Sequence, residues 1–184
     1  MSNIPPIQNP LEMVKAHLGE ALLDSKVFRD ELTLIVASHR VVEVLKFLRD
    51  TSGLYYNFLS DISAVDYYPE FSRAERFGVS YHLYSMLYNR RLRVKTFVAE
   101  DAPVLPTSTV LWLNANWLER EIMDMMGIEF EGHPDPRRLL MPEDWQGHPH
   151  RRDYPLGYET IMFSFNVEDI AKHKPFAKPM SEFK

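Results

Sequence analysis

Histidines and aspartates gather in one polar part of the chain, between residues 131 and 155. Both residue types ligate zinc, so a stand-alone metal-dependent hydrolase is one hypothesis. The six candidates are His133, Asp135, Asp144, His148, His150 and Asp153. Their spacing differs from that of H-E-x-x-H, in which two histidines stand one helical turn apart. We therefore predict no metal site and interpret these residues as turn residues whose imidazoles bond to the backbone or to a partner protein.

Two carboxylates, Glu119 and Glu121, are the other candidates for acid–base chemistry. They fall within a predicted helix, where residues two apart do not share a face. We therefore predict no catalytic residue there and expect both glutamates on a solvated or interface-facing surface. Arg120 and Asp124 are four residues apart, and we expect them to form an ion pair on the outer face of the same helix.

Two arginine doublets have side chains that could contact phosphate. They are Arg137 with Arg138 and Arg151 with Arg152. Acidic residues are interleaved with them, and the whole chain has a formal net charge of −5, so we expect no nucleic acid partner. The planar guanidinium group suits ion pairs across a protein interface, and this is the interpretation we favour.

Cysteine is absent from the 184 residues, and the seven glycines include no G-x-G motif. These absences exclude disulfides, catalytic thiols and thiolate-held iron–sulfur clusters, and they leave no dinucleotide fingerprint. We therefore expect this chain to bind no cofactor, and any redox cofactor to lie in another chain. Trp112, Trp117 and Trp145 are interpreted as core or interface anchors. The absence of cysteine fits a reducing, cytoplasmic setting. The N-terminus differs from a secretion signal, and no apolar run reaches about 18 residues, so we expect no membrane span.

The elements that would position these residues are predicted from periodicity and turn signals. Asn9 and Pro10 are typical of a helix start, and an apolar stripe with helical spacing indicates a second helix near residues 41–48. A polar turn at 29–31 separates two β-favouring runs, which predicts a hairpin. Three further strands are predicted within 58–68, 76–86 and 91–100.

The last of these strands, 91–100, alternates most regularly, with arginine and lysine on one face and leucine and valine on the other. One face of the sheet is therefore wet, which favours antiparallel or mixed pairing. The link at 88–90 is short enough to make the last two strands a hairpin. We predict an α+β fold: a two-layer domain with a mixed or antiparallel sheet and helices on one side.

The C-terminal third of the chain has a different character. A helix is predicted at 117–126, and Gly127 stands where a left-handed cap would end it. Seven of the thirteen prolines then fall within 131–184, which argues against long helices or central strands. We therefore divide the chain into a globular α+β domain, 1–128, and an extended, irregular C-terminal docking arm, 129–184.

Long motifs in this region resemble the signature of one protein family. The run from Glu119 to Leu156 is similar to the pattern of the C subunit of bacterial NADH-quinone oxidoreductase (respiratory complex I), the counterpart of the mitochondrial iron–sulfur protein 3 subunit. The matching positions are Glu119, Arg120, Glu121, Asp124, Gly127, Gly132, His133, Pro134, Asp135, Arg137, Arg138, Glu143, Asp144, Trp145, Gly147, His148, Pro149, Arg151, Arg152, Asp153, Tyr154 and Pro155. The resemblance extends over about residues 30–160. Met123 and Met126 stand where the family usually has tyrosine and phenylalanine.

This resemblance implies a cofactor-free subunit in the peripheral arm of a proton-translocating NADH-quinone oxidoreductase. FMN and the iron–sulfur clusters that carry electrons from NADH to quinone would be held by partner subunits. The matching residues would be contacts with those partners, chiefly the D subunit and the other members of the quinone-reducing module. The subunit would lie on the cytoplasmic face of the cell membrane and associate with the membrane only through the complex.

The same resemblance also fits the homologous subunit of a membrane-bound hydrogenase or of a ferredoxin-accepting photosynthetic complex. These machines share the fold and differ in the subunits that deliver electrons. The sequence therefore leaves open whether the electron donor is NADH or ferredoxin.

Overall fold

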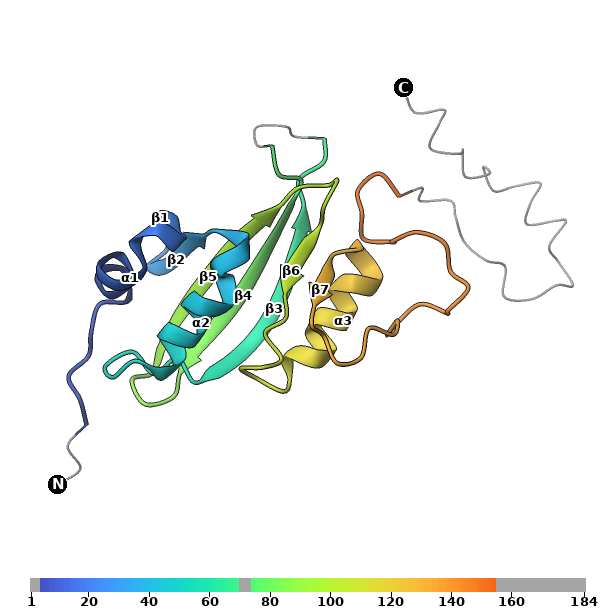
Figure 1. Ribbon diagram of the computed structural model, residues 1–184. Helices are drawn as coiled ribbons and strands as arrows, with labels where there is room; N and C mark the ends of the chain where they lie inside the picture. Colours follow the sequence, from blue (N-terminus) through green and yellow to red (C-terminus); the bar gives the residue numbers. More distant parts are fainter. Residues whose placement is uncertain (1–3, 70–73, 155–184) are drawn as a thin grey trace, which may run out of the picture.

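The computed structural model describes residues 4–69 and 74–154, in which a five-stranded sheet is packed against helices (Figure 1). The strand order across the sheet is β1-β2-β5-β4-β3. The strands are β1 (Leu22–Phe28), β2 (Glu31–Val36), β3 (Phe58–Asp66), β4 (Phe77–Ser85) and β5 (Arg90–Val98). Neighbours pair antiparallel, except that β2 and β5 are parallel. The predicted mixed sheet is therefore confirmed.

The described residues include three α-helices: α1 (Pro10–Leu18), α2 (Val41–Asp50) and α3 (Ala115–Met126). The Asn9 side chain accepts a 3.0 Å hydrogen bond from the backbone N–H of Leu11, so the predicted start of α1 is confirmed. Short 3-10 turns follow α1 and precede α2, at Gly19–Ala21 and Ser38–Arg40. None of the described helices has the length and apolar character needed to cross a membrane.

Both predicted hairpins are present. β1 and β2 are joined by Arg29 and Asp30, whose φ angles are 51° and 62°. Two successive residues at positive φ give the kind of turn that best matches the twist of paired strands. The connection from β4 to β5 also contains a residue at positive φ, Asn89 at 50°, and asparagine tolerates this region better than most residues.

The core lies between one face of the sheet and the helices. On β4, Phe77, Val79, Tyr81 and Leu83 are all buried. The apolar stripe of α2 is buried in the same cluster. The buried residues of β4, which repeat every two positions, and those of α2, which follow the helical period of 3.6, therefore belong to one core.

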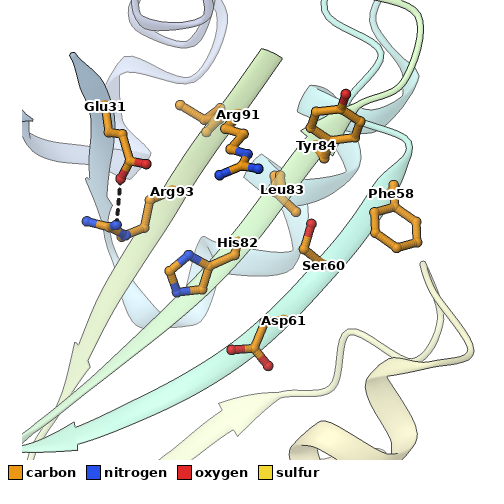
Figure 2. Close-up of a pocket in the computed structure, with 10 residues that line it drawn as sticks. Glu31, Phe58, Ser60, Asp61, His82, Leu83, Tyr84, Arg91 and Arg93 are labelled. Atoms are coloured by element: carbon orange, nitrogen blue, oxygen red, sulfur yellow. Dashed lines mark hydrogen bonds and ion pairs between the residues drawn. The ribbon is translucent and has the colours of Figure 1, made fainter. Parts of the chain in front are cut away.

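We call the opposite face of the sheet the open face. Arg91 and Arg93 lie on it along β5, beside Tyr84 and His82 of β4 (Figure 2). Lys95 lies on the same face, further along β5. The hollows on this face are lined by strand residues and by one residue just beyond β3. The two-layer α+β arrangement, with helices on one side of the sheet, is therefore confirmed.

A small parallel pair of strands joins the domain to the start of the predicted docking arm. β6 (Val104–Pro106) pairs with β7 (Glu129–Glu131), and α3 connects the two. Ile128 and Phe130 are buried in the core. Residues 132–154 then form turns and bends without a further helix or strand. The rest of the predicted arm, 155–184, lies outside the described residues.

Candidate functional site

Helix α3 has two different buried faces. Ile122 and Met126 belong to the core, whereas Arg120 and Asp124 are covered by residues 132–154, which return over the helix (Figure 1). The exposed fractions are only 7% for Arg120 and 1% for Asp124. The prediction that these two pair on an outer face is therefore wrong, because the returning segment covers both and gives each its own partner. We call this contact between α3 and residues 132–154 the α3 seam.

Asp124 is the acceptor that holds a turn of the returning segment. Its Oδ2 accepts hydrogen bonds from three successive backbone N–H groups, those of Leu139 (3.0 Å), Leu140 (2.7 Å) and Met141 (2.8 Å). Its Oδ1 accepts a 2.7 Å hydrogen bond from Nη1 of Arg138. Burial favours the neutral acid, but these hydrogen bonds outweigh it and keep the pKa of Asp124 below its usual value. The carboxylate is therefore ionised and fully engaged, so it acts as an anchor rather than as a base.

Arg120 holds the residues just before that turn. Its Nε donates to the carbonyl O of Arg137 at 2.9 Å, and its Nη2 donates to that of Arg138 at 3.2 Å. Its Nη1 lies 3.2 Å from Oδ2 of Asp135. The guanidinium also lies over the Trp117 ring, 5.1 Å from the ring centroid. The planar donor fork of arginine suits this set of simultaneous contacts, and it fixes the segment at several points.

Two histidines of the motif bond to backbone groups. His133 Nε2 lies 3.2 Å from the carbonyl O of Asn116, and its Nδ1 accepts a 3.0 Å hydrogen bond from the backbone N–H of Asp135. His148 Nδ1 donates to the carbonyl O of Asp124 at 2.8 Å. The interpretation as turn residues that bond to the backbone is therefore confirmed for these two. Within the described part of the chain, no three His, Asp or Glu side chains gather in a way that would hold a metal ion.

Acidification is expected to loosen the α3 seam through His148. Burial, together with the charges of Arg151 and Arg138, keeps the pKa of His148 below its usual value, although its hydrogen bond to the Asp124 carbonyl opposes this. The unfolded pKa is about 6.5, so the neutral ring contributes its full stability above that pH. This contribution is lost as the pH falls from there toward the lower folded pKa.

Urea denaturation at about pH 7.5 and about pH 5.5 measures this effect, with His148→Gln as the comparison. The glutamine amide keeps a hydrogen-bond donor but does not titrate. The wild-type chain should lose more unfolding free energy between the two pH values than the variant loses. Equal losses in the two chains would mean that the other titrating groups, and not His148, set the pH dependence.

The C-terminal end of α3 is capped by the same segment. Arg151 Nε donates to the carbonyl O of Met126 at 2.8 Å. Gly127 ends the helix at a φ of 71°, which confirms the predicted left-handed cap. A Cβ at this position would lie 2.5 Å from ring atoms of His148, so glycine is required by the close approach as well as by its φ. The seam thus supplies donors that the last carbonyls of a helix otherwise lack.

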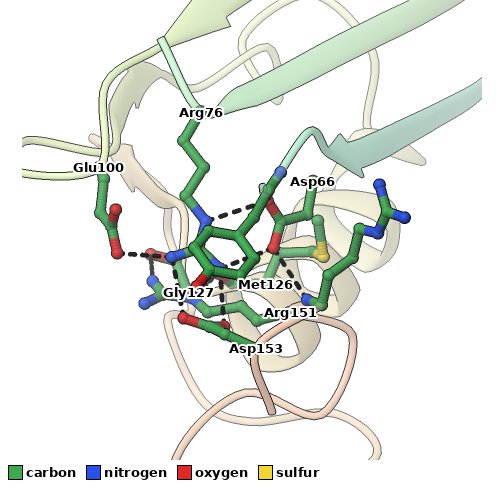
Figure 3. A network of polar contacts seen from close by, with 9 residues as sticks. Asp66, Arg76, Glu100, Met126, Gly127, Arg151 and Asp153 are labelled. Carbon is green, nitrogen blue, oxygen red and sulfur yellow. Dashed lines mark hydrogen bonds and ion pairs between the residues drawn. The ribbon is translucent and has the colours of Figure 1, made fainter. Parts of the chain in front are cut away.

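A second cluster ties the far end of the segment to the sheet (Figure 3). Arg76, just before β4, donates through Nε (2.9 Å) and Nη2 (2.7 Å) to the two carboxylate oxygens of Asp66 at the end of β3. It also donates through Nη2 (2.6 Å) and Nη1 (3.0 Å) to Asp153, and through Nη1 (2.5 Å) to Glu100. The side chains of Arg76 and Asp66 are only 4% and 1% exposed. One buried guanidinium therefore joins carboxylates from three parts of the chain. We call these four residues the Arg76 cluster.

Asp66 has further donors within the same cluster. The backbone N–H groups of Tyr68 and Arg152 each donate to it at 2.9 Å. Burial alone would raise the pKa of Asp66. The hydrogen bonds from Arg76 and from these N–H groups lower it by a larger amount, so the pKa lies below its usual value. Asp66, Arg76 and Glu100 were not predicted as site residues. No local spacing marks them, because Arg76 is 10 to 77 residues from the carboxylates that it joins.

Glu119, which we expected to face solvent or a partner, is fully buried. Its carboxylate accepts hydrogen bonds from the Thr107 hydroxyl (2.5 Å), the Ser108 hydroxyl (2.6 Å) and the Ser108 backbone N–H (2.6 Å). The expectation is wrong because the loop after β6 supplies enough donors to offset the desolvation of a carboxylate. Glu121 is exposed, and the two glutamates do lie on different faces of the helix.

The remaining residues of the predicted partner contact fall into two groups, which differ in how far their side chains are exposed to solvent. Those that are half-buried are His133, Asp135, Arg138, Trp145, His148, Pro149, Arg151, Asp153 and Tyr154. Those that are exposed are Gly132, Pro134, Arg137, Glu143, Asp144, Gly147 and Arg152. Pro155 lies outside the described residues. Each arginine doublet is therefore split, with one side chain half-buried in the seam and one exposed.

Comparison with known sequences extends well beyond the motifs. Residues 34–160 match the family described as "Respiratory-chain NADH dehydrogenase, 30 Kd subunit". A protein from Roseiflexus sp. (strain RS-1), named as the C subunit of NADH-quinone oxidoreductase, is 48% identical over 168 residues, which are 91% of this chain and 95% of that protein. A protein of the same name from Roseiflexus castenholzii is 48% identical over 174 residues, which are 94% of this chain and 98% of that protein.

Two solved structures resemble this fold. A trypsin-resistant fragment (1-134) of Nqo5 is 35% identical with a TM-score of 0.60, and the match covers 69% of this chain and 99% of the fragment. A chain of an archaeal respiratory membrane complex, the membrane-bound sulfane sulfur reductase, shares the fold alone, at 21% identity and a TM-score of 0.63, over 94% of this chain and 99% of that one. The family match spans most of the described domain and the α3 seam. The chain therefore belongs to the family of the 30 kDa subunit of respiratory-chain NADH dehydrogenase.

Proposed function

We propose that this chain is the C subunit of a proton-translocating NADH-quinone oxidoreductase and supports electron transfer to quinone without catalysing a step itself. The observation that carries the proposal is the 48% identity to two proteins of that name, over 95% and 98% of their lengths. Two features support a non-catalytic role. The chain has no cysteine to hold an iron–sulfur cluster, and the buried carboxylates of α3 are engaged as structural acceptors. FMN and the clusters then belong to other subunits.

The C-terminal part, 129–184, is the proposed docking arm, chiefly toward the D subunit. Residues 132–154 are its root, because Arg120, Asp124 and Arg76 hold this stretch against the domain. A root fixed in this way presents its exposed side chains in one geometry, which lowers the entropy lost on binding. The trypsin-resistant Nqo5 fragment matches 69% of this chain, which supports a domain that is stable without its C-terminal part. Association with the membrane, on its cytoplasmic face, then occurs through the complex.

A truncation after Tyr154 tests the docking arm. This truncated chain keeps every described contact of the α3 seam, so we expect it to fold and to lose its partner. An affinity-tagged copy replaces the native chain, the complex is extracted in mild detergent, and the co-purifying subunits are quantified by mass spectrometry. Recovery of the D subunit should fall at least about tenfold, which corresponds to about 1.4 kcal/mol of binding free energy. A chain lacking only residues 1–3 is the matched control and should recover the D subunit normally.

The same purification tests the docking arm and the assignment as the C subunit separately. A truncated chain that recovered the D subunit as well as the full chain does would rule out residues 155–184 as the part of the arm that docks. A full-length chain that brought down no quinone-reducing subunits would contradict the assignment as the C subunit. Electron-input subunits of a hydrogenase, or of a ferredoxin-accepting complex, in place of NADH-oxidising subunits would favour the homologous subunit of those machines.

A further inference from the structure

The open face of the sheet carries a column of basic side chains. Arg91, Arg93 and Lys95 alternate along β5, the central strand, and so repeat every two residues, about 7 Å apart. The pairing register places Tyr84 of β4 beside Arg91 and His82 beside Arg93 (Figure 2). The column therefore runs along the middle of the sheet, on the face opposite the core.

Two adjoining hollows lie along this column and share His82 and Arg93. Their volumes are about 530 Å³ and about 550 Å³. Phe58 lines the first and Phe28 the second, and these rings are 46% and 62% exposed. We call the combined depression the open-face groove. Arginine and aromatic side chains are enriched at protein interfaces, so the composition of the groove favours a protein partner.

The open-face groove is basic although the chain is acidic. Four cationic side chains and two carboxylates line it, a local net charge of +2 with His82 neutral, against −5 for the whole chain. The six charged residues are Lys26, Arg91, Arg93, Lys95, Glu31 and Asp61. A surface whose charge opposes that of its own protein attracts a partner of the opposite sign.

Two of these cations are already engaged within the chain. Arg93 forms a 2.9 Å ion pair with Glu31, and Lys95 contacts the Tyr67 hydroxyl. In the described part of the chain, Arg91 and Lys26 form no ion pair, and both are exposed. The groove therefore holds positive charge that the described residues do not neutralise, at the Arg91 end of the basic column and on β1 at Lys26.

We propose that the open-face groove docks an extended, acidic segment of another subunit of the same complex. The inference rests on the proposed function, which supplies neighbouring subunits. Alternate side chains of an extended segment repeat about 7 Å apart, so carboxylates at alternate positions match the spacing of the basic column. The α3 seam lies at the β3 edge, away from this column, so the chain holds two neighbours at separate surfaces.

Photo-cross-linking in the assembled complex identifies the occupant. p-Benzoylphenylalanine is placed at Ser60, which is exposed and lines the groove, and at Lys46, an exposed residue of α2 that serves as the control. Irradiation should join Ser60, but not Lys46, to one peptide of another subunit that is rich in Asp and Glu. Cross-links to lipid, to this chain itself or to a peptide without excess acidic residues would overturn the proposal, as would the absence of any cross-link at Ser60.

Charge reversal tests the electrostatic part. The double variant Lys26→Glu/Arg91→Glu should bind the complex about tenfold more weakly at low salt, and added salt should restore part of the loss because it screens repulsion. The control Lys15→Glu/Lys46→Glu makes the same change in net charge on exposed positions of α1 and α2. Recovery of the tagged chain with the complex is measured against NaCl concentration.

The outcomes distinguish this inference from the proposed function. Equal recovery of the two double variants would overturn the docking of an acidic segment, while normal recovery of the wild-type chain would leave the assignment as the C subunit intact. Failure of the wild-type chain to join an oxidoreductase would remove the proposed function, and this inference with it. Both double variants should unfold at the same temperature, because all four positions are exposed.

Discussion

The free energy of unfolding is expected to fall by about 3–5 kcal/mol when Arg76 is replaced by alanine. The substitution leaves the carboxylates of Asp66, Glu100 and Asp153 facing one another without their shared cation. Asp66 is only 1% exposed, so water cannot replace its lost hydrogen bonds. An ion pair in solvent would contribute far less, about 0.2–1 kcal/mol, because water solvates both charges.

Urea denaturation followed by far-UV circular dichroism measures this loss, with Arg40→Ala as the matched control. Arg40 makes a similar two-point contact with Glu43, at 2.7 and 2.9 Å, but the Glu43 side chain is 49% exposed. The loss of unfolding free energy in Arg76→Lys should lie between the losses in Arg76→Ala and Arg40→Ala, because an ammonium group keeps the charge without the planar donor fork. A loss in Arg76→Ala no larger than that in Arg40→Ala would show that the Arg76 cluster contributes little to stability.

Trypsin is expected to cleave after Arg138 about 100-fold faster when Asp124 is replaced by alanine. The substitution removes the acceptor of three backbone N–H groups and of the Arg138 guanidinium. Hydrogen bonds to a charged group contribute about 1.5–3 kcal/mol each, and their loss favours local opening of the turn. If the free energy needed to open the turn falls by about 3 kcal/mol, the open population rises by about the stated factor. The cleavage rate rises by the same factor when opening and closing are faster than cleavage.

The control for this experiment is Asp144→Ala, which removes an exposed aspartate from the same segment. Cleavage of the intact chain is followed by mass spectrometry over time, so that cuts after Arg137 and Arg138 are resolved from each other. Asp144→Ala should be cleaved at the wild-type rate. If the two variants were cleaved equally fast, Asp124 would not be the residue that holds the turn.

Local patterns predicted most of the secondary structure because they act over short distances along the chain. The cap at Asn9, the alternation on β5 and the short link at 88–90 each depend on neighbouring residues. The parallel pairing of β2 with β5 was not predictable in this way. Thr33 and Arg93 are 60 residues apart, and a strand with one wet face alternates in the same manner in either orientation.

Buried charges account for the errors at the candidate site. In the sequence, Glu119, Arg120 and Asp124 have the pattern of a solvated helix face, because charged residues are mostly exposed. In the fold, each finds partners 11 to 18 residues away, and Arg76 reaches Asp153 across 77 residues. Such burial depends on complementarity between segments that are distant in the sequence. Periodicity and propensity are local properties and do not predict it.

The two buried faces of α3 limit how freely this helix can change over evolutionary time. On α2, outward positions such as Glu43 and Lys46 are solvated, so many replacements there are harmless. On α3, a charged position such as Asp124 is as constrained as the apolar Ile122, because both are covered. In a saturation-mutagenesis map of the chain, α3 would therefore be intolerant at charged as well as apolar positions, with tolerance kept at exposed positions such as Glu121.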